Sequence, residues 1–274
     1  MFVAGRPCPR SMSMATQSFA QYARIAVTTA VPTARVLLKN PPVNVIDFSM
    51  MEELAQALAD IEGGSDIPAI VISGEGQNFS AGVDVAAHTP GKVESMLTKF
   101  HAVIRTLVST KKVTIAAVRG NCLGGGAELA LVCDLVYTTE SAQWGFPEIK
   151  LGCFPPVAVT ALAPLIGQKQ AADLILTGRT ISGKEAAHIG LANRAVSDDQ
   201  LSAIVDESLS RLGSLSPAAL SLTKKAIYAW DCMHFDKGLA RAEKTYLEEL
   251  IKTEDAREGI DAFLQKRQPR WTGK

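Results

Sequence analysis

A strand that runs straight into a glycine-rich loop constrains the fold of this chain more than any other feature. Val113–Val118 is an apolar run of strand length, and the loop Gly120–Gly126 follows it. The next patterns predict a helix over Ala127–Cys133 and a strand over Leu135–Thr138. Strand, helix and strand in alternation favour right-handed crossovers and parallel pairing, so the sequence predicts an α/β fold.

The N-terminal part of the chain shows the same alternation. A Val31-Pro32 turn between two short apolar runs is typical of a hairpin. Ser49, with Glu52 three residues later, predicts a helix start, and Gly63-Gly64 predicts its end. We therefore expect strands over Ile25–Thr29, Ala34–Leu38 and Pro68–Ser73, and helices over Met50–Ile61 and Val93–Ser109.

The C-terminal part is expected to be mostly helical, and no low-complexity linker or internal repeat divides the chain. The simplest organisation is a loose N-terminal lead over residues 1–20, an α/β core over residues 21–200 and a helical region over residues 201–274. Helices are expected over Gln168–Leu176, Ser182–His188, Asp198–Arg211, Pro217–Trp230, Gly238–Ile251 and Asp255–Lys266.

The charge balance argues against two classes of partner. Basic and acidic residues both number 28 among the 274, so nothing electrostatic favours nucleic acid or an anionic membrane. No apolar run reaches the roughly 18 residues that cross a bilayer. The first acidic residue is Asp47, which makes the N-terminus weakly similar to a transit peptide. We expect a cytoplasmic protein, with the mitochondrial matrix as the alternative.

The remaining polar and sulfur residues predict no metal site. The five cysteines are scattered and never form a CxxC pair, so buried free thiols are expected rather than a disulfide framework or zinc. The four histidines share no ligand spacing and are expected on the surface or in packing. Lys224, Lys225, Lys266 and Arg267 are expected to be solvated charges.

Two glutamates twenty positions apart are the strongest candidates for chemistry. Glu128 follows the triplet Gly124–Gly126, which allows the backbone to approach a ligand closely, and Glu148 follows Pro147. Two carboxylates in one apolar pocket cannot both ionise easily, so the pKa of one rises and the pair can hold and deliver a proton near neutrality.

Other functions of glycine-rich loops agree less well with this sequence. The segment fails the dinucleotide pattern GxGxxG, and Gly126-Ala127 stands where a phosphate-binding loop requires Lys-Ser/Thr. Ser80 lacks the first glycine of a Gly-x-Ser-x-Gly nucleophile elbow, because position 78 is Asn. Small residues in Asn78–Asp84 and in the glycine loop expose backbone N–H groups, and two such groups could form an oxyanion hole.

The ordered set of motifs resembles the crotonase superfamily, specifically its enoyl-CoA hydratases. The resemblance runs from about Ile25 to Trp271. It rests on Ser80–Asp84, Gly124–Glu128, Cys133–Leu135, Pro147–Gly152, Leu176–Ile181, Glu185-Ala186, Gly190–Asn193, Pro217 with Thr223-Lys224, and Phe263 with Lys266-Arg267. It implies a spiral of ββα units with a helical trimerisation region, assembled as a homotrimer or a dimer of trimers.

The resemblance also implies residue roles. Ala81 and Gly125 would donate backbone N–H groups to the thioester oxygen, Glu128 would orient and activate water, and Glu148 would supply the proton to Cα. The acyl-CoA substrate carries its own coenzyme A, and no metal, nicotinamide or flavin is expected. Substrate and CoA contacts are implied for Ala81, Gly82, Val83, Asp84, Gly124, Gly125, Phe154, Phe263 and Lys266, the last two in a neighbouring subunit.

One segment departs from the pattern of most relatives. Cys153–Ala158 replaces a Pro-Gly-rich stretch, with Phe154 and two prolines, and Trp144 and Phe146 precede Glu148. Core packing and a rigid aromatic pocket are both open readings of these aromatic residues. The segment is similar to dienoyl-CoA hydratases that act on cyclohexa-1,5-diene-1-carbonyl-CoA. An enoyl-CoA isomerase and a non-catalytic crotonase-fold binding protein remain the alternative functions.

Overall fold

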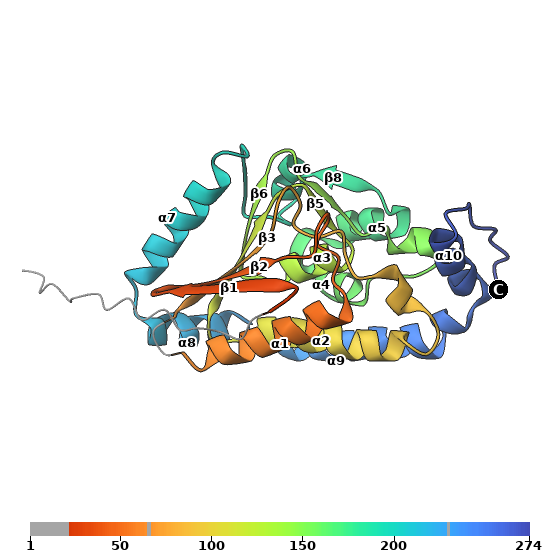
Figure 1. Cartoon of the computed structure of the whole chain (residues 1–274), viewed down its shortest axis with the longest axis horizontal. Coiled ribbons are helices and arrows are strands. Elements are labelled where there is room, and N and C mark those ends of the chain that lie inside the picture. The colour runs from red at the N-terminus through yellow and green to blue at the C-terminus, as the bar shows by residue number, and fades with distance from the viewer. Residues whose placement is uncertain (1–21, 65–66, 229–230) are drawn as a thin grey trace, which may run out of the picture.

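The predicted α/β class is confirmed. A computed structural model describes residues 22–64, 67–228 and 231–274 (Figure 1). The predicted N-terminal lead over residues 1–20 lies outside the described residues. None of the helices within those three ranges is long and apolar enough to cross a membrane.

The main sheet has six strands in the order β1-β2-β3-β4-β6-β9. β1 and β2 form the predicted antiparallel hairpin, and every other neighbouring pair is parallel. Parallel pairing follows from the helices that connect these strands, as the alternation predicted. The strands are β1 (Ile25–Ala30), β2 (Thr33–Leu38), β3 (Ala69–Gly74), β4 (Val113–Val118), β6 (Leu135–Thr139) and β9 (Arg194–Val196).

Helices cover both faces of this sheet, and the strands divide their side chains between two cores. In β3, Ile70 and Ile72 join the larger core with α1 (Phe48–Glu62) and α2 (Val93–Ser109). Val71 faces the other way, against α7 (Leu201–Gly213). Figure 1 shows α7 apart from α1 and α2, across the sheet. A strand covered on both faces is apolar throughout, which explains its continuous apolar sequence.

A second, three-stranded sheet was not predicted. It consists of β5 (Asn121–Leu123), β7 (Gln143–Gly145) and β8 (Thr180–Ser182), with β5 parallel to β7 and β7 antiparallel to β8. Strands of three residues are too short to show a period in the sequence. The predicted loop Gly120–Gly126 therefore contains a strand, and helix α3 (Gly125–Leu131) begins inside it.

Several helix ends differ from their predictions. Asp47, not Ser49, caps α1, because its side chain accepts a hydrogen bond from the N–H of Met50. Helix α4 (Pro156–Ile166) was missed because Pro155-Pro156 and Pro164 resemble helix breakers, whereas a proline at the first helical position is favourable. The other helices are η1 (Val85–His88), η2 (Pro147–Leu151), α5 (Gln168–Thr177), α6 (Gly183–His188), α8 (Pro217–Tyr228), α9 (Asp231–Glu248), η3 (Leu250–Lys252) and α10 (Glu254–Leu264).

The interior corrects one prediction and confirms another. Lys224, expected in solvent, is buried, and its Nζ lies 2.7 Å from Asp134 Oδ2. Cys122, Cys133 and Cys153 are buried free thiols, as predicted. Cys8 and the side chain of Cys232 lie outside the described part. Trp144 packs in the core, where its Nε1 donates to Thr138 Oγ1 at 3.0 Å.

Candidate active site

The two glutamates come together at one cavity, although they lie on different elements. Glu128 is on α3, which β4 and β5 lead into, and Glu148 is on η2, which begins at Pro147. Both line a cavity of about 400 Å³. A larger cavity of about 940 Å³ contains neither glutamate in its wall. The smaller cavity is therefore the candidate active site.

Glycines make room for this arrangement. Gly124 has a positive φ of 51°, and a Cβ at that position would lie 2.6 Å from Glu148 Oε1. A Cβ on Gly125 would lie 2.6 Å from the Val83 side chain, and one on Gly126 would lie 2.7 Å from Ser80 Cβ. The triplet is thus explained by close packing of two loops and a carboxylate.

Glu128 is a buried carboxyl group fixed by a helix N-terminus. Its Oε1 accepts hydrogen bonds from the N–H groups of Val157 at 2.8 Å and Ala158 at 3.0 Å, both in the first turn of α4. Burial raises the pKa of Glu128, and this effect exceeds the opposing attraction of His101 and the two N–H donors. The missed helix α4 is therefore what holds this carboxyl group in place.

Glu148 has a different environment. Burial, followed by repulsion from Glu128, raises its pKa to about 8. Its Oε2 is buried and makes no hydrogen bond within the described structure. A carboxyl group with that pKa is mostly protonated at neutrality, so Glu148 can act as a proton donor.

Two backbone N–H groups at the cavity have no partner in the parts of the chain described, those of Val83 and Gly125. They lie close together, because a Cβ on Gly125 would be 3.3 Å from the Val83 nitrogen. The N–H of Ala81, predicted as a donor, already donates to the carbonyl oxygen of Val43 at 2.8 Å. The Ala81 N–H is thus occupied in this structure, whereas the N–H groups of Val83 and Gly125 are free, within the described chain, to donate to a ligand oxygen; the donor roles stay a prediction.

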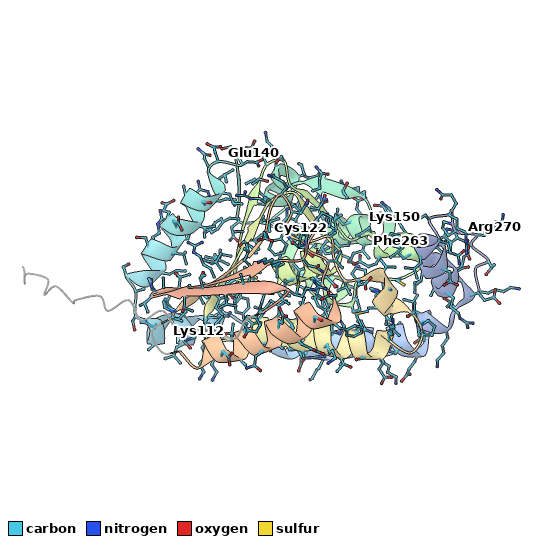
Figure 2. All side chains as sticks on the ribbon, viewed as in Figure 1. Lys112, Cys122, Glu140, Lys150, Phe263 and Arg270 are labelled. Atoms are coloured by element: carbon cyan, nitrogen blue, oxygen red, sulfur yellow. The ribbon has the colours of Figure 1, made fainter. Side chains whose placement is uncertain are left out.

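The other predicted contact residues divide into two groups. Ala81, Gly82, Val83, Gly124, Phe154 and Phe263 line the cavity. Asp84 and Lys266 do not: the Asp84 side chain caps η1 by accepting from the N–H of Ala86. Lys150, Arg267 and Phe263 belong to the cavity wall, and Figure 2 shows Lys150 and Phe263 near the end of the molecule that carries the C-terminus.

The sequence analysis gave no site role to two buried polar residues of the cavity wall. His101 on α2 and Tyr246 on α9 are both buried, and both line the cavity. Neither sits in a recognisable motif, and each matches the apolar spacing of its helix, so only the fold reveals their position. Phe154 packs edge-on against Tyr246, with ring centroids 5.3 Å apart.

The segment Cys153–Ala158, which differs from the pattern of most relatives, forms part of the cavity wall. Phe154, Pro155 and Pro156 line it, and Cys153 lies beside Tyr246. Burial raises the pKa of the Cys153 thiol to about 11, so this thiol stays protonated and inert near neutrality. Within the three described ranges, no group of three or more His, Cys, Asp or Glu residues is arranged to hold a metal ion.

Comparisons with known proteins show which family the chain resembles. Residues 30–274 match the family model described as enoyl-CoA hydratase/isomerase. The chain is 35% identical over 239 residues to the cyclohexa-1,5-dienecarbonyl-CoA hydratase of Thauera aromatica, covering 86% of this chain and 92% of that protein. It is 34% identical over 248 residues to a probable enoyl-CoA hydratase of Bacillus subtilis, covering 88% of this chain and 95% of that one.

Solved structures show the same fold. An enoyl-CoA hydratase/isomerase from Xanthobacter autotrophicus Py2 has a TM-score of 0.82 at 30% identity, over 92% of this chain and 100% of its own. An enoyl-CoA hydratase from Mycobacterium avium subsp. paratuberculosis K-10 has a TM-score of 0.83 at 26% identity, over 92% of this chain and 100% of its own. The chain therefore belongs to the enoyl-CoA hydratase/isomerase family of enzymes.

Proposed function

We propose that this protein adds water across the α,β double bond of an enoyl-CoA or dienoyl-CoA thioester. The observation that carries the proposal is the pair Glu128 and Glu148 in one buried cavity beside the free N–H groups of Val83 and Gly125. A non-catalytic binding protein has no need of two carboxyl groups with raised pKa values in an apolar site.

The chemistry follows from these positions. The two N–H groups would bind the thioester oxygen and stabilise the negative charge that it gains when water attacks Cβ. One such donor is worth roughly 3 kcal/mol. Glu128, in its ionised form, would hold the water and take its proton, while protonated Glu148 would deliver a proton to Cα. Positioned acid and base groups contribute about 10²- to 10⁴-fold each.

We propose cyclohexa-1,5-diene-1-carbonyl-CoA as the acyl-CoA to test first. The protein from Thauera aromatica that carries this substrate in its name is 35% identical. Phe154, Pro155 and Tyr246 add flat, rigid surface to the cavity, which suits an alicyclic group better than a flexible chain.

We also propose that the chain assembles as a homotrimer or a dimer of trimers. Helix α8 presents Leu222 and Ile227 to solvent with exposed fractions of 67% and 64%. Exposed apolar side chains on one helix are typical of a subunit interface.

The test is mass-resolved turnover on crotonyl-CoA and cyclohexa-1,5-diene-1-carbonyl-CoA. A product heavier by one water from the cyclic thioester alone supports the specialised hydratase. Water addition to crotonyl-CoA supports a hydratase of open-chain acyl groups. A product of unchanged mass with a moved double bond identifies an isomerase, and intact thioesters from both substrates contradict the proposed function.

A further inference from the structure

The cavity contains more unpaired polar atoms than the two glutamates explain. Among the side chains described, four buried polar atoms have no hydrogen-bond partner: Thr29 Oγ1, His101 Nε2, Glu148 Oε2 and Tyr246 Oη. The last three belong to residues that line the candidate active site, and of these the Tyr246 hydroxyl has the Cys153 thiol beside it, which leaves His101 Nε2 and Glu148 Oε2 as the atoms without a neighbouring partner among the described residues. Leaving a buried polar group unpaired is unfavourable, so the gathering of such atoms at one cavity points to a polar ligand.

His101 is held in one orientation by an acid on another helix. Its Nδ1 lies 2.6 Å from Glu243 Oε1 on α9. Arg105 donates from the same helix as His101 to both oxygens of Glu243, at 2.9 Å and 3.1 Å, and is itself paired with Asp236. Burial would raise the pKa of Glu243, but the bonds from His101 and Arg105 outweigh it and lower the pKa.

This arrangement fixes the tautomer of a neutral His101. An ionised Glu243 has no hydrogen to give, so the hydrogen in the short contact must be on Nδ1 of His101. Nε2 is then left with a lone pair, and it is the atom without a partner. A carboxylate that orients an imidazole in this way produces a positioned hydrogen-bond acceptor.

The surroundings of the imidazole are charged on one side and open on the other. Arg105 lies on its own helix, and Glu243, Asp236 and Tyr246 come from α9. Glu128 on α3 is close enough to be attracted by the ring whenever His101 is protonated, and Glu148 and His88 share the cavity wall. The free Nε2 therefore belongs to the same small space as the carboxyl group that would hold water.

We propose that His101 Nε2 accepts a hydrogen bond from the oxygen that adds to Cβ, which makes it a third residue in contact with the reacting atoms. This inference rests on the proposed hydration. The water oxygen bonds to Cβ, one of its O–H bonds breaks and that proton passes to Glu128. The π electrons move toward the thioester oxygen, and the proton of Glu148 passes to Cα. The second O–H bond stays intact and donates to Nε2, so His101 gains no proton.

The first test compares two substitutions at the same position. Phe at position 101 keeps a ring and removes the acceptor, and Gln places an amide oxygen near Nε2. His101→Phe should lower kcat for hydration about 10²-fold, with KM for the thioester little changed, because the lost contact is with the reacting oxygen. His101→Gln should restore part of kcat, because its amide oxygen again offers an acceptor to the reacting oxygen.

A matched control separates this contact from simple packing. Val103→Ala removes a buried side chain from the same helix without touching the cavity, so it should lower the melting temperature and leave kcat unchanged. If His101→Phe lowers kcat no more than Val103→Ala does, the role of His101 is overturned while the hydration stands. If the wild type hydrates neither thioester tested above, the proposed function fails and the role of His101 fails with it.

A second measurement needs no variant. Nitrogen NMR of the full chain, labelled on its histidines, reports which ring nitrogen carries hydrogen. For His101 we expect hydrogen on Nδ1 at neutral pH and a shift of the Nε2 signal when 3-hydroxybutyryl-CoA binds. Hydrogen on Nε2 alone, or a bound hydroxyacyl thioester that leaves the Nε2 signal in place, would overturn the proposal.

Discussion

Glu128 and Glu148 are the same residue type in unequal surroundings, and this difference divides their proposed roles. Glu128 accepts from two N–H groups of α4, whereas a Glu148 oxygen has no partner within the described ranges. Hydrogen bonds to a carboxylate favour its charged form, and burial without them favours the neutral form. Glu148 is therefore the better proton donor and Glu128 the better base.

The pKa of about 8 at Glu148 predicts the pH dependence of hydration. The protonated form needed to supply Cα is present below that pKa and is lost above it. We expect kcat/KM for hydration to fall as the pH rises through about 8, measured in buffers of constant ionic strength. A rate that increases across this range would assign the opposite role to Glu148.

Substituting Gly124 should slow turnover in addition to lowering the free energy of unfolding. In Gly124→Ala, the new Cβ would displace Glu148 Oε1, 2.6 Å away, so we expect kcat to fall by about 10²-fold. Gly76→Ala is the matched control, because Gly76 also has a positive φ, 72°, but nothing lies within 4 Å of its Cβ position. Both substitutions should lower the free energy of unfolding by about 1–2 kcal/mol, because Ala at a positive φ strains the backbone. Only Gly124→Ala should also slow turnover.

At the scale of elements, the sequence predicted what had a period and missed what depended on contacts. The spans of α2 and β4 were predicted to the residue because each is a sustained apolar pattern. The three-residue strand β5 and the proline-rich helix α4 had no such pattern. At the site, the glutamates stood out beside glycine and proline, whereas His101 depends on the approach of α2 to α9.

The buried position of Lys224 has a measurable consequence, because this residue joins α8 to the sheet. Its Nζ donates to the Lys112 carbonyl oxygen and pairs with Asp134, which also accepts from Thr114. Lys224→Met should lower the free energy of unfolding by about 3–5 kcal/mol, because it leaves a buried carboxylate without its partner. Lys225→Met, at the exposed neighbour, should change it by about 0.5 kcal/mol or less in urea denaturation.

At the scale of the whole molecule, the elements far from the cavity determine its shape. Helix α9 runs alongside α2 and brings Tyr246 to the cavity wall, and α10 closes the end at which Phe263 lies (Figures 1 and 2). The predicted boundary between an α/β core over residues 21–200 and a helical region over residues 201–274 stays a prediction. The α/β class was predictable because its signal is distributed over many strands and helices, whereas the cavity depends on contacts between segments remote in the chain.

The proposed assembly predicts the mass of the particle in solution. Light scattering should give a mass that is a multiple of three times the 29.2 kDa chain. Leu222→Glu, which places a charge on the exposed apolar face of α8, should shift the population to smaller species, and Lys225→Gln should not. A wild-type mass equal to that of one chain would contradict the proposed assembly.

The central claim is that Glu128 and Glu148 together add water to an unsaturated thioester. The most direct measurement is the hydration rate of Glu128→Gln and Glu148→Gln on whichever thioester the wild type hydrates. Glu140→Gln serves as the control, because Glu140 is exposed and lies away from the cavity (Figure 2). We predict that each site variant loses about 10²-fold or more in kcat and that the control keeps the wild-type rate. A wild-type rate in either site variant would contradict the claim.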